Sequence, residues 1–258
     1  MHYIRLMASF SIVIPSFDQD RYIRETLENV VLLKKQAAQK NIKVQLILVD
    51  NCSNKETAAV INDFKSEIDN LFIEKDKGQY DAINKGLKYV AGDFWTWLNT
   101  DDLLDIEGFF KTAEILNANN EIDYIYGNVG YIDAHSKFYK SYTSGNLSLE
   151  KLTQGDASIS QPGSFFRTEF TKKIGELQEY RFAFDYEYIL RCFKYKAKVH
   201  KLEDNVAYFR YYDASKSGSK NYKFLQEQFS ISKLYGRSFF SKLTFMLMIR
   251  IIKRRLFN

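Results

Sequence analysis

The N-terminal part of the sequence alternates short apolar runs with longer amphipathic stretches, and this alternation restricts the fold more than any other feature. The apolar runs predict buried strands at residues 10–15, 44–50, 71–74 and 94–98. The stretches between them have apolar residues at helical spacing and predict helices at residues 21–40, 57–68 and 81–90, the first of them capped by Asp18 or Asp20. Strands joined by such helices pair in parallel through right-handed crossovers. We therefore expect an α/β fold with a mostly parallel central sheet flanked by helices.

Length and composition favour one main domain. A chain of 258 residues with 45% hydrophobic residues can bury a large core, and it contains no linker-like segment and no internal repeat. From about residue 123 the pattern is less regular, with strands expected at residues 124–127, 164–167, 199–202 and 207–211 and helices at 168–175 and 185–194. Cys52 and Cys192 form no metal-ligand or disulfide pattern, and residues 1–17 do not have the pattern expected of a secretory signal. We expect a cytoplasmic protein.

Positive charge is concentrated near the C-terminus. No acid follows Glu227, whereas seven basic residues do, and their charge exceeds the net charge of +5, which leaves −2 for the rest of the chain. These residues are Lys233, Arg237, Lys242, Arg250, Lys253, Arg254 and Arg255. Because the positive charge is confined to this segment and no nucleic-acid motif accompanies it, nucleic-acid binding is disfavoured.

Residues 243–257 join an apolar stretch to this basic cluster. The stretch is interrupted by Arg250 and is shorter than the about 20 apolar residues that a membrane-spanning helix needs. We expect residues 221–258 to form a basic, amphipathic helical tail that lies on the inner face of the cytoplasmic membrane. The alternative is a helix that packs on the catalytic domain or on a second subunit, so a homodimer stays open.

Polar residues follow three of the predicted strands at the points where the strands end. Pro15, Asp50 and residues 99–102 lie at these points, and ligands of parallel sheets bind in the crevice beyond the carboxyl ends of the strands. The adjacent acids Asp101 and Asp102 suit Mn²⁺ or Mg²⁺, with the phosphates of a diphosphate completing the metal shell. The alternatives are that Asp101 or Asp102 caps a helix that begins near residue 106, and that Asp50 only organises an Asx turn.

Residues 77–86 place a glycine before a predicted helix, with Asp81 and Asn84 one helical turn apart on the same side. Such a turn can line a ligand pocket. The same pattern also fits a helix cap at Asp81 and a packed polar side chain at Asn84.

Five segments together resemble glycosyltransferase family 2: IVIPSF, ILVDNCSN, DKGQYDAINKGLKYVAGDFWTWLNTDD, QPGSFFR and FDYEYILR, in this order. Each segment alone is weak, and the specificity lies in their order and spacing over about residues 9–215. The resemblance implies a GT-A (Rossmann-like) fold for residues 1–220, with a nucleotide-sugar half at about 9–120 and an acceptor half at about 121–220. The implied activity is inverting transfer from a nucleotide diphosphate sugar, expected to be a UDP-sugar, to a glycan or polyprenyl-linked acceptor in cell-surface polysaccharide biosynthesis.

The resemblance also implies roles for individual residues on the donor side. Pro15, Ser16 and Phe17 match the loop beside the base, Asp50 the acid on the uracil side, Asp101 a position near the ribose and Asp102 the Mn²⁺ or Mg²⁺ ligand. Lys77, Asp81 and Asn84 match the segment that lines the donor pocket. Arg210 matches a basic position near the diphosphate, followed by Lys216 and Ser217 on a loop that could close over the donor. The alternative for Arg210 is an ordinary surface arginine. At the start of the acidic segment, Asn99 stands where many relatives have aspartate.

Inverting transfer also needs a carboxylate that takes the proton from the acceptor hydroxyl. Asp185 matches the family's base position, although relatives often have Glu-Asp where this chain has Phe184 and Asp185. The alternatives are that Asp185 is only an N-cap, or that Glu187 is the base. Gln161 matches a segment that approaches the acceptor.

Other classes of function are less well supported. No GxGxxG motif follows the first strand, which disfavours a dehydrogenase. The non-enzyme alternative is a degenerate, non-catalytic module that binds a sugar nucleotide or a glycan. Such a module would be favoured if the base or the metal acid were missing, and the chain has both.

Overall fold

The N-terminal half contains every strand and helix that the sequence predicts there. The computed structural model describes residues 7–156, 159, 161–212 and 222–256. Its first elements are β1 (Phe10–Ser16), α1 (Ile23–Gln39), β2 (Val44–Asp50), α2 (Lys55–Asp63), β3 (Asn70–Ile73), α3 (Gln79–Leu87) and β4 (Phe94–Trp97). In β1, Phe10, Ile12 and Ile14 face one side of the sheet and Val13 faces the other, which is the two-residue period of a strand buried on both faces.

The C-terminal half is more irregular, as expected. It consists of β5 (Leu103–Leu104), α4 (Ile106–Ala118), β6 (Tyr124–Ile132), β7 (Phe138–Tyr142), α5 (Leu149–Gln154), a 3₁₀ turn (Gln161–Gly163), β8 (Ser164–Arg167), α6 (Thr168–Ile174), α7 (Phe184–Lys194), β9 (Val199–Arg210), α8 (Tyr222–Leu234) and α9 (Lys242–Leu256). The two strands predicted at residues 199–202 and 207–211 form one strand, β9. The short elements β5, β7 and α5 were not predicted.

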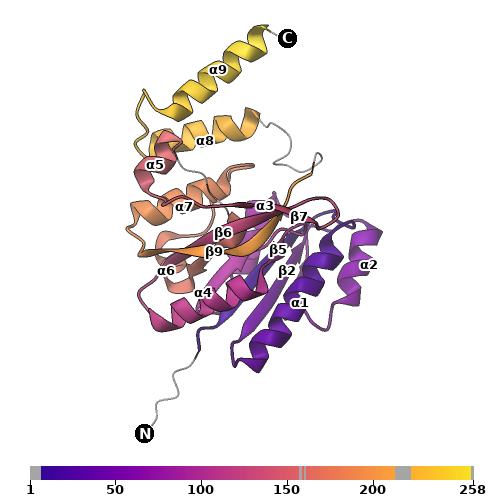
Figure 1. Ribbon diagram of the computed structural model, residues 1–258. Coiled ribbons are helices and arrows are strands. Elements are labelled where there is room, and N and C mark those ends of the chain that lie inside the picture. Colours follow the sequence, from indigo (N-terminus) through magenta and orange to yellow (C-terminus); the bar gives the residue numbers. More distant parts are fainter. Residues whose placement is uncertain (1–6, 157–158, 160, 213–221, 257–258) are drawn as a thin grey trace.

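All strands belong to one sheet with the order β3-β2-β1-β4-β8-β6-β9-β5, and β7 pairs with β6 (Figure 1). Strands β3, β2, β1 and β4 are parallel to one another, and β6 is parallel to β9. Strand β8 is antiparallel to β4 and β6, β5 is antiparallel to β9, and β7 is antiparallel to β6. The sheet is therefore mixed beyond β4. The α/β fold class is confirmed, and the β3-β2-β1-β4 order places the ends of three parallel strands side by side.

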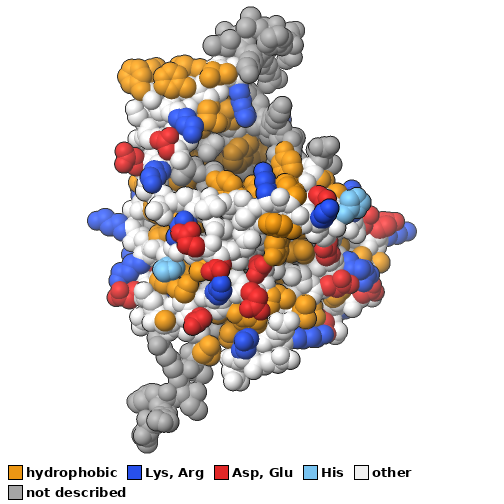
Figure 2. Space-filling view, in the orientation of Figure 1, with side chains coloured by type: hydrophobic (Ala, Val, Ile, Leu, Met, Phe, Trp, Pro, Cys, Tyr) orange, Lys and Arg blue, Asp and Glu red, His pale blue; other side chains and the backbone are white. Residues whose placement is uncertain are grey.

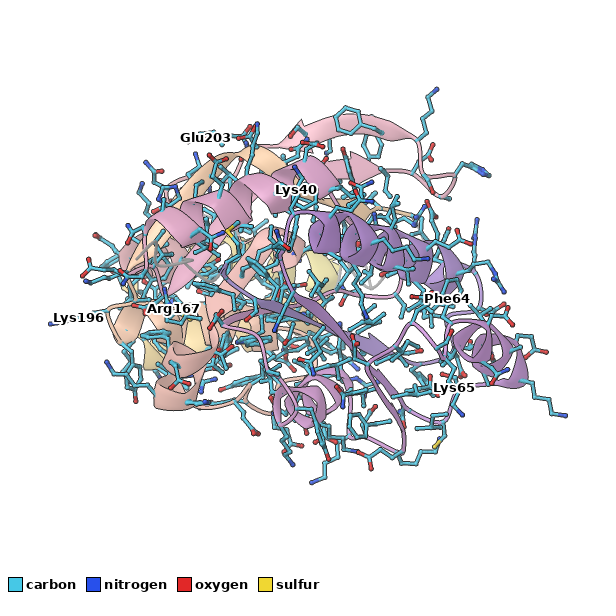
Figure 3. All side chains as sticks on the ribbon, turned by 90° about the horizontal axis from the view of Figure 1, so that it is seen from below. Lys40, Phe64, Lys65, Arg167, Lys196 and Glu203 are labelled. Atoms are coloured by element: carbon cyan, nitrogen blue, oxygen red, sulfur yellow. The ribbon has the colours of Figure 1, made fainter. Side chains whose placement is uncertain are left out.

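Helices cover both faces of this sheet. One apolar layer lies beneath α1 and α4 and includes Leu27 and Phe109; the other lies beneath α3, α6 and α7 and includes Ile83 and Tyr188. Figure 3 shows the first pair from below, with Lys40 just beyond the end of α1 and its ammonium 4.9 Å from the ring centre of a phenylalanine of α4. Both layers together hold the strand ends in fixed positions.

Two helix starts differ from the sequence-based expectation. Helix α1 has no side-chain cap, because Asp18 instead accepts a hydrogen bond from the Asn54 N–H (2.8 Å) and ties the β1 loop to the β2 loop. Helix α4 is capped by Asp105, which accepts from the Gly108 N–H (2.7 Å). The predicted cap of α1 is therefore wrong, and Asp101 and Asp102 do not cap α4.

The C-terminal helices pack on the rest of the protein. Helix α8 lies against α5 and α7, and α9 lies on α8 through a small apolar cluster of Leu225, Leu243 and Leu247 (Figure 1, top). None of the described helices is long and apolar enough to cross a membrane. Figure 2 shows apolar side chains gathered at the end of the molecule where α9 lies.

Candidate active site

The ends of β1, β2 and β4 form the edge of the sheet at which the sequence predicts ligand binding. Ser16 stands beside Asp50 in the β1–β2 register, and Trp97 stands beside Val13. The segment 99–102, which follows β4, therefore emerges next to the β1 loop. The structure brings the three predicted segments together.

On the β2 side, Asp50 is buried and organises its own loop. Its two carboxylate oxygens accept hydrogen bonds from the Ser53 N–H (2.8 Å) and the Ser53 hydroxyl (2.5 Å). Asp50 therefore forms the Asx turn that was the alternative for this residue. The turn does not prevent an additional contact between Asp50 and a ligand. The hydroxyl of Ser16 is buried with no hydrogen-bond partner among the described residues, and Phe17 is exposed at the rim. A buried hydroxyl without a partner is the kind of group that a bound ligand satisfies.

The start of α3 adds further acids and an amide. Asp81 accepts a hydrogen bond from the Lys77 N–H (3.0 Å). Asn84 exchanges two hydrogen bonds with the backbone of Leu177 (2.8 and 2.9 Å), as the packed-side-chain alternative predicted. Asp76, which the sequence reasoning did not single out, lies here too. Burial raises its pKa, and the charges of Asp81 and Asp50 add to that effect. Asp76, Asp81 and Asp50 thus lie close enough for their charges to interact.

The two acids after β4 lie in different surroundings. Asp102 has no exposed surface, and its oxygens accept from the Arg210 N–H (3.0 Å) and from the Asn99 amide (2.9 Å). Burial, followed by the charge of Asp101, raises the pKa of Asp102 well above its usual range. Asp101 is partly exposed and accepts from the Tyr212 hydroxyl (3.1 Å). Of the two acids, Asp101 is the one that solvent reaches.

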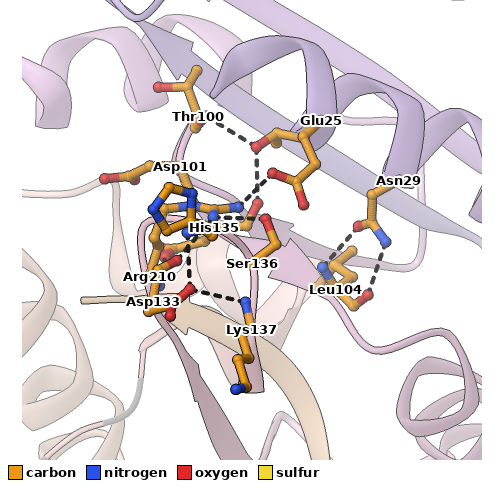
Figure 4. A network of polar contacts seen from close by, with 12 residues as sticks. Glu25, Asn29, Thr100, Asp101, Leu104, Asp133, His135, Ser136, Lys137 and Arg210 are labelled. Carbon is orange, nitrogen blue, oxygen red and sulfur yellow. Dashed lines mark hydrogen bonds and ion pairs between the residues drawn. The ribbon is translucent and has the colours of Figure 1, made fainter. Parts of the chain in front are cut away.

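Arg210 is the cation of this site and is not a surface residue. Its side chain has no exposed surface and donates to the Asp101 carbonyl (2.9 Å), the Ser136 hydroxyl (2.8 Å) and the Glu25 carboxylate (2.7 Å). Its guanidinium also lies 4.3 Å from the centre of the Tyr22 ring. Figure 4 shows this network joining α1, the segment after β4 and the β6–β7 turn. The alternative that Arg210 is an ordinary surface residue is wrong. No local pattern in the sequence indicated its partners Glu25 and Ser136, or Tyr212, which binds Asp101.

The donor atoms present suit a hard divalent cation. Two adjacent carboxylates, one of them buried, offer the oxygen ligands that Mn²⁺ and Mg²⁺ prefer. A cation would favour the charged form of Asp102, whose pKa is raised first by burial and then by the charge of Asp101. The described residues contain no group of three or more His, Cys, Asp or Glu side chains that could hold a metal ion. Substrate phosphates and water would therefore have to supply most of the ligands, as is usual for Mg²⁺.

Asp185 lies in the first turn of α7, in the wall of a cavity of about 240 Å³. Burial raises the pKa of Asp185 to about 6, and the charge of Glu227 adds to this rise. Hydrogen bonds from two backbone N–H groups act in the opposite direction. Helix α7 has no side-chain cap of its own, so the N-cap alternative for Asp185 does not hold. A carboxylate with a pKa near neutrality that faces a cavity can act as a general base.

Glu187 is engaged elsewhere. It is buried, forms an ion pair with Arg191 (2.8 Å) and accepts a hydrogen bond from the Tyr235 hydroxyl (2.5 Å). Because both of its oxygens are used in this buried network, its geometry favours a structural role, whereas that of Asp185 favours a base.

The segment after β4 and the start of α7 are joined through packed residues. The Gln161 amide donates to the Trp97 carbonyl (2.9 Å), and the Trp97 ring lies 6.1 Å from the Phe184 ring, centre to centre. Phe184, which stands where relatives often have glutamate, is thus a core residue of this junction. Gln161 is itself buried. Lys216 and Ser217 lie outside the described residues.

Comparisons with known proteins identify the family of the chain. The model of the family described as "Glycosyl transferase family 2" matches residues 11–175. A PGL/p-HBAD biosynthesis glycosyltransferase of Mycobacterium bovis is 25% identical over 195 residues, which is 74% of this chain and 72% of that protein. An uncharacterized glycosyltransferase of Nostoc sp. is 24% identical over 217 residues, which is 80% of this chain and 65% of that protein.

Two solved structures share the fold. S. aureus TarS 1–349 in complex with UDP-GlcNAc has a TM-score of 0.68 at 17% identity and covers 91% of this chain and 67% of its own. The mannosyltransferase PcManGT from Pyrobaculum calidifontis, in complex with GDP-Man and Mn²⁺, has a TM-score of 0.62 at 13% identity and covers 85% and 61%. The family model spans more than half of the sequence, and the chain belongs to glycosyltransferase family 2.

Proposed function

We propose that this glycosyltransferase moves a sugar, with inversion, from a nucleotide diphosphate sugar to an acceptor hydroxyl, and that Asp185 is the general base. The observation that carries the proposal is the position of Asp185, a carboxylate in a cavity wall whose pKa is raised to about 6. The alternative acid, Glu187, is tied into a buried ion pair. In this reaction Asp185 takes the proton of the acceptor hydroxyl as the acceptor oxygen attacks the anomeric carbon. The bond between the anomeric carbon and the diphosphate oxygen breaks, and its electron pair leaves with the diphosphate.

We further propose that the donor binds along the ends of β1, β2 and β4. Ser16 offers its unpaired hydroxyl, Phe17 an exposed ring, Asp50 and Asp81 acceptors, and Lys77 an exposed cation. Asp102 would hold Mn²⁺ or Mg²⁺, which would neutralise the charge that develops on the leaving diphosphate, and Asp101 would lie near the ribose. Arg210 keeps Asp102 in place through its backbone N–H and adds positive charge. A UDP-sugar is the preferred donor, and TarS, which shares the fold, is described in complex with UDP-GlcNAc.

The acceptor side is proposed to lie over Asp185, with Gln161 supporting the junction to β4. We infer a glycan or lipid-linked acceptor of cell-surface polysaccharide biosynthesis and a location at the inner face of the cytoplasmic membrane. The support is the outer surface of the C-terminal segment, where large apolar side chains lie exposed beside basic residues. The exposed apolar residues are Phe239, Phe240, Phe245, Met248 and Ile249. Lys242 and Arg250 are exposed basic residues in the described part of α9.

A thermal-shift screen of UDP, GDP and dTDP, each with and without Mn²⁺, followed by transfer assays with the matching sugar conjugates, tests the donor and metal assignments. We expect one nucleotide to raise the melting temperature only with Mn²⁺. Asp102→Asn should lose that shift, whereas Asp185→Asn should keep it and lose transfer. Nucleotide binding without transfer by the wild type to any acceptor would favour a non-catalytic binding module.

The membrane assignment has its own test. Sedimentation with vesicles of anionic or of zwitterionic lipid should show binding to the anionic ones, and the double variant Phe239→Ser/Phe240→Ser should weaken it. Leu32→Ser removes an exposed apolar residue from α1, outside the C-terminal segment, and is the control. Equal binding by both variants would contradict contact through this segment.

A further inference from the structure

The cavity over Asp185 is built largely by the C-terminal helices. Besides Asp185 it is lined by Gly155, Ile159, Tyr186, Phe224, Gln228, Leu243 and Met246. Phe224 and Gln228 come from α8, and Leu243 and Met246 come from α9. The lining therefore combines one carboxylate with mainly apolar side chains from α8 and α9, two helices that lie beyond the matched family region.

The chemistry of this lining selects a kind of acceptor. Asp185 and Gln228 can satisfy a hydroxyl group, but the remaining side chains offer mainly apolar surface. A purely polar sugar that filled the cavity would leave hydroxyl groups without hydrogen-bond partners, at a cost in binding. An apolar group next to the reacting hydroxyl would instead bury its surface against Phe224, Leu243 and Met246.

We propose that this cavity binds an acceptor that carries an apolar group beside its reacting hydroxyl, as in a glycoside with a hydrocarbon aglycone. This inference rests on the proposed function. The exposed apolar face of α9 is a different surface, because Phe245 does not line the cavity.

Hexyl β-D-glucopyranoside and methyl β-D-glucopyranoside are suitable probes, because they differ only in the length of the alkyl group. Calorimetric titration of the full chain should give a Kd for the hexyl glycoside at least about tenfold lower, the effect of about two buried methylene groups. Met246→Gln and Phe224→Gln should remove most of this preference. Phe245→Gln should keep it.

The outcomes separate this proposal from the proposed function. Equal affinity for the two glycosides, or an equal loss in Phe245→Gln and Met246→Gln, overturns the cavity assignment even if sugar transfer is observed. A hexyl preference that depends on Met246 and Phe224 supports the assignment even if no nucleotide sugar is used, and in that case the proposed reaction alone fails.

A second observation concerns the acid Glu227 of α8, which lies at the start of α7. Its carboxylate accepts hydrogen bonds from the N–H groups of Arg181 (3.2 Å), Phe182 (2.8 Å) and Ala183 (3.0 Å). These residues lead directly into the turn that carries Asp185. A carboxylate at a helix N-terminus also interacts favourably with the helix dipole.

We infer that Glu227 is a positioning residue, which fixes the entry to α7 and thereby the place and charge state of Asp185. Among the residues that the structure describes, the titratable side chains around Asp185 are Glu227 from α8, Tyr124 from β6 and Tyr186 on α7 itself, and the two residues that α9 contributes to the cavity are apolar. Glu227 is the one whose negative charge raises the pKa of Asp185.

Glu227→Gln keeps an acceptor oxygen and removes the charge. We expect the acid limb of its pH profile for kcat/KM to move to lower pH, with the donor KM unchanged. Glu227→Ala should lower kcat by about tenfold to a hundredfold, because it frees the loop before Asp185. Glu150→Gln, which removes an exposed acid from α5, is the matched control for charge. An unmoved acid limb in Glu227→Gln, whatever its melting temperature, would overturn the inference.

Discussion

The buried pair of Glu187 and Arg191 allows the base assignment to be tested through stability as well as activity. The Glu187 side chain is 1% exposed and the Arg191 side chain 8% exposed, and their charged atoms are 2.8 Å apart. Removing one member of such a pair leaves the other charge buried and typically costs about 3–5 kcal/mol. Glu187→Ala also leaves the Tyr235 hydroxyl without its acceptor, so we expect a loss near the upper end of this range.

Glu187→Gln should cost less, because its amide oxygen can still accept from Arg191 or Tyr235. The double variant Glu187→Leu/Arg191→Met removes both charges and should be more stable than the sum of the single effects predicts, by about 2 kcal/mol or more. Recovery will be partial, since Arg191 also donates to the carbonyls of Ile174 (2.9 Å) and Glu176 (2.8 Å).

Urea unfolding at neutral pH measures these losses, and transfer rates taken at a temperature where each variant is folded separate them from catalysis. We expect Glu187→Gln to transfer sugar at a rate within a few-fold of the wild type. Full stability combined with lost transfer in Glu187→Gln would show that Glu187, and not Asp185, is the base. Additive single and double effects would show that the two charges are not coupled.

Three further predictions use other parts of the structure. Because the pKa of Asp185 is raised to about 6 in the folded protein, kcat/KM should rise with pH through that value. The same shift means that the folded state loses stability from this group as pH rises through the range from about 4 to 6. Asp185→Asn should therefore be more stable than the wild type at pH 7, by about 1–3 kcal/mol in urea unfolding, and a less stable variant would contradict the shift. Gly108→Ala would drive a methyl group into the Asn205 carbonyl oxygen and should abolish soluble expression, whereas Gly145→Ala, with open space around it, should not. Arg210→Lys cannot reproduce the contacts to Glu25, Ser136 and the Asp101 carbonyl and should lower the melting temperature by several degrees, measured by calorimetry.

The sequence was sufficient for those parts of the fold and site that depend on local patterns. Strand period and strand end fixed the positions of Ser16, Asp50 and residues 99–102, because the carboxyl ends of parallel neighbours meet at one edge. The partners of Arg210 could not be found in this way. Glu25 and Ser136 are far from it in the sequence, in α1 and after β6, and neither lies in a recognisable motif. The pairing of β9 with β6 brings Arg210 to Ser136, and the packing of α1 on β5, which pairs with β9, brings it to Glu25.

The predicted boundary between a domain of residues 1–220 and a tail bears directly on how α8 works. Helix α8 contributes Glu227 to the start of α7 and two residues to the cavity wall, and Tyr235, just beyond its end, binds Glu187. A chain that ends at residue 221 would lose all of these contacts, expose the apolar surface that α8 covers on α5 and α7, and leave Glu187 with Arg191 alone. We expect it to melt at a lower temperature and to be inactive even on a soluble acceptor. A chain that ends at residue 241 keeps α8 and Tyr235, so it should retain the pH profile set by Asp185 and Glu227 while losing the preference for a hexyl glycoside. Full activity of the shorter chain on a soluble acceptor would show that the C-terminal segment is an appendage.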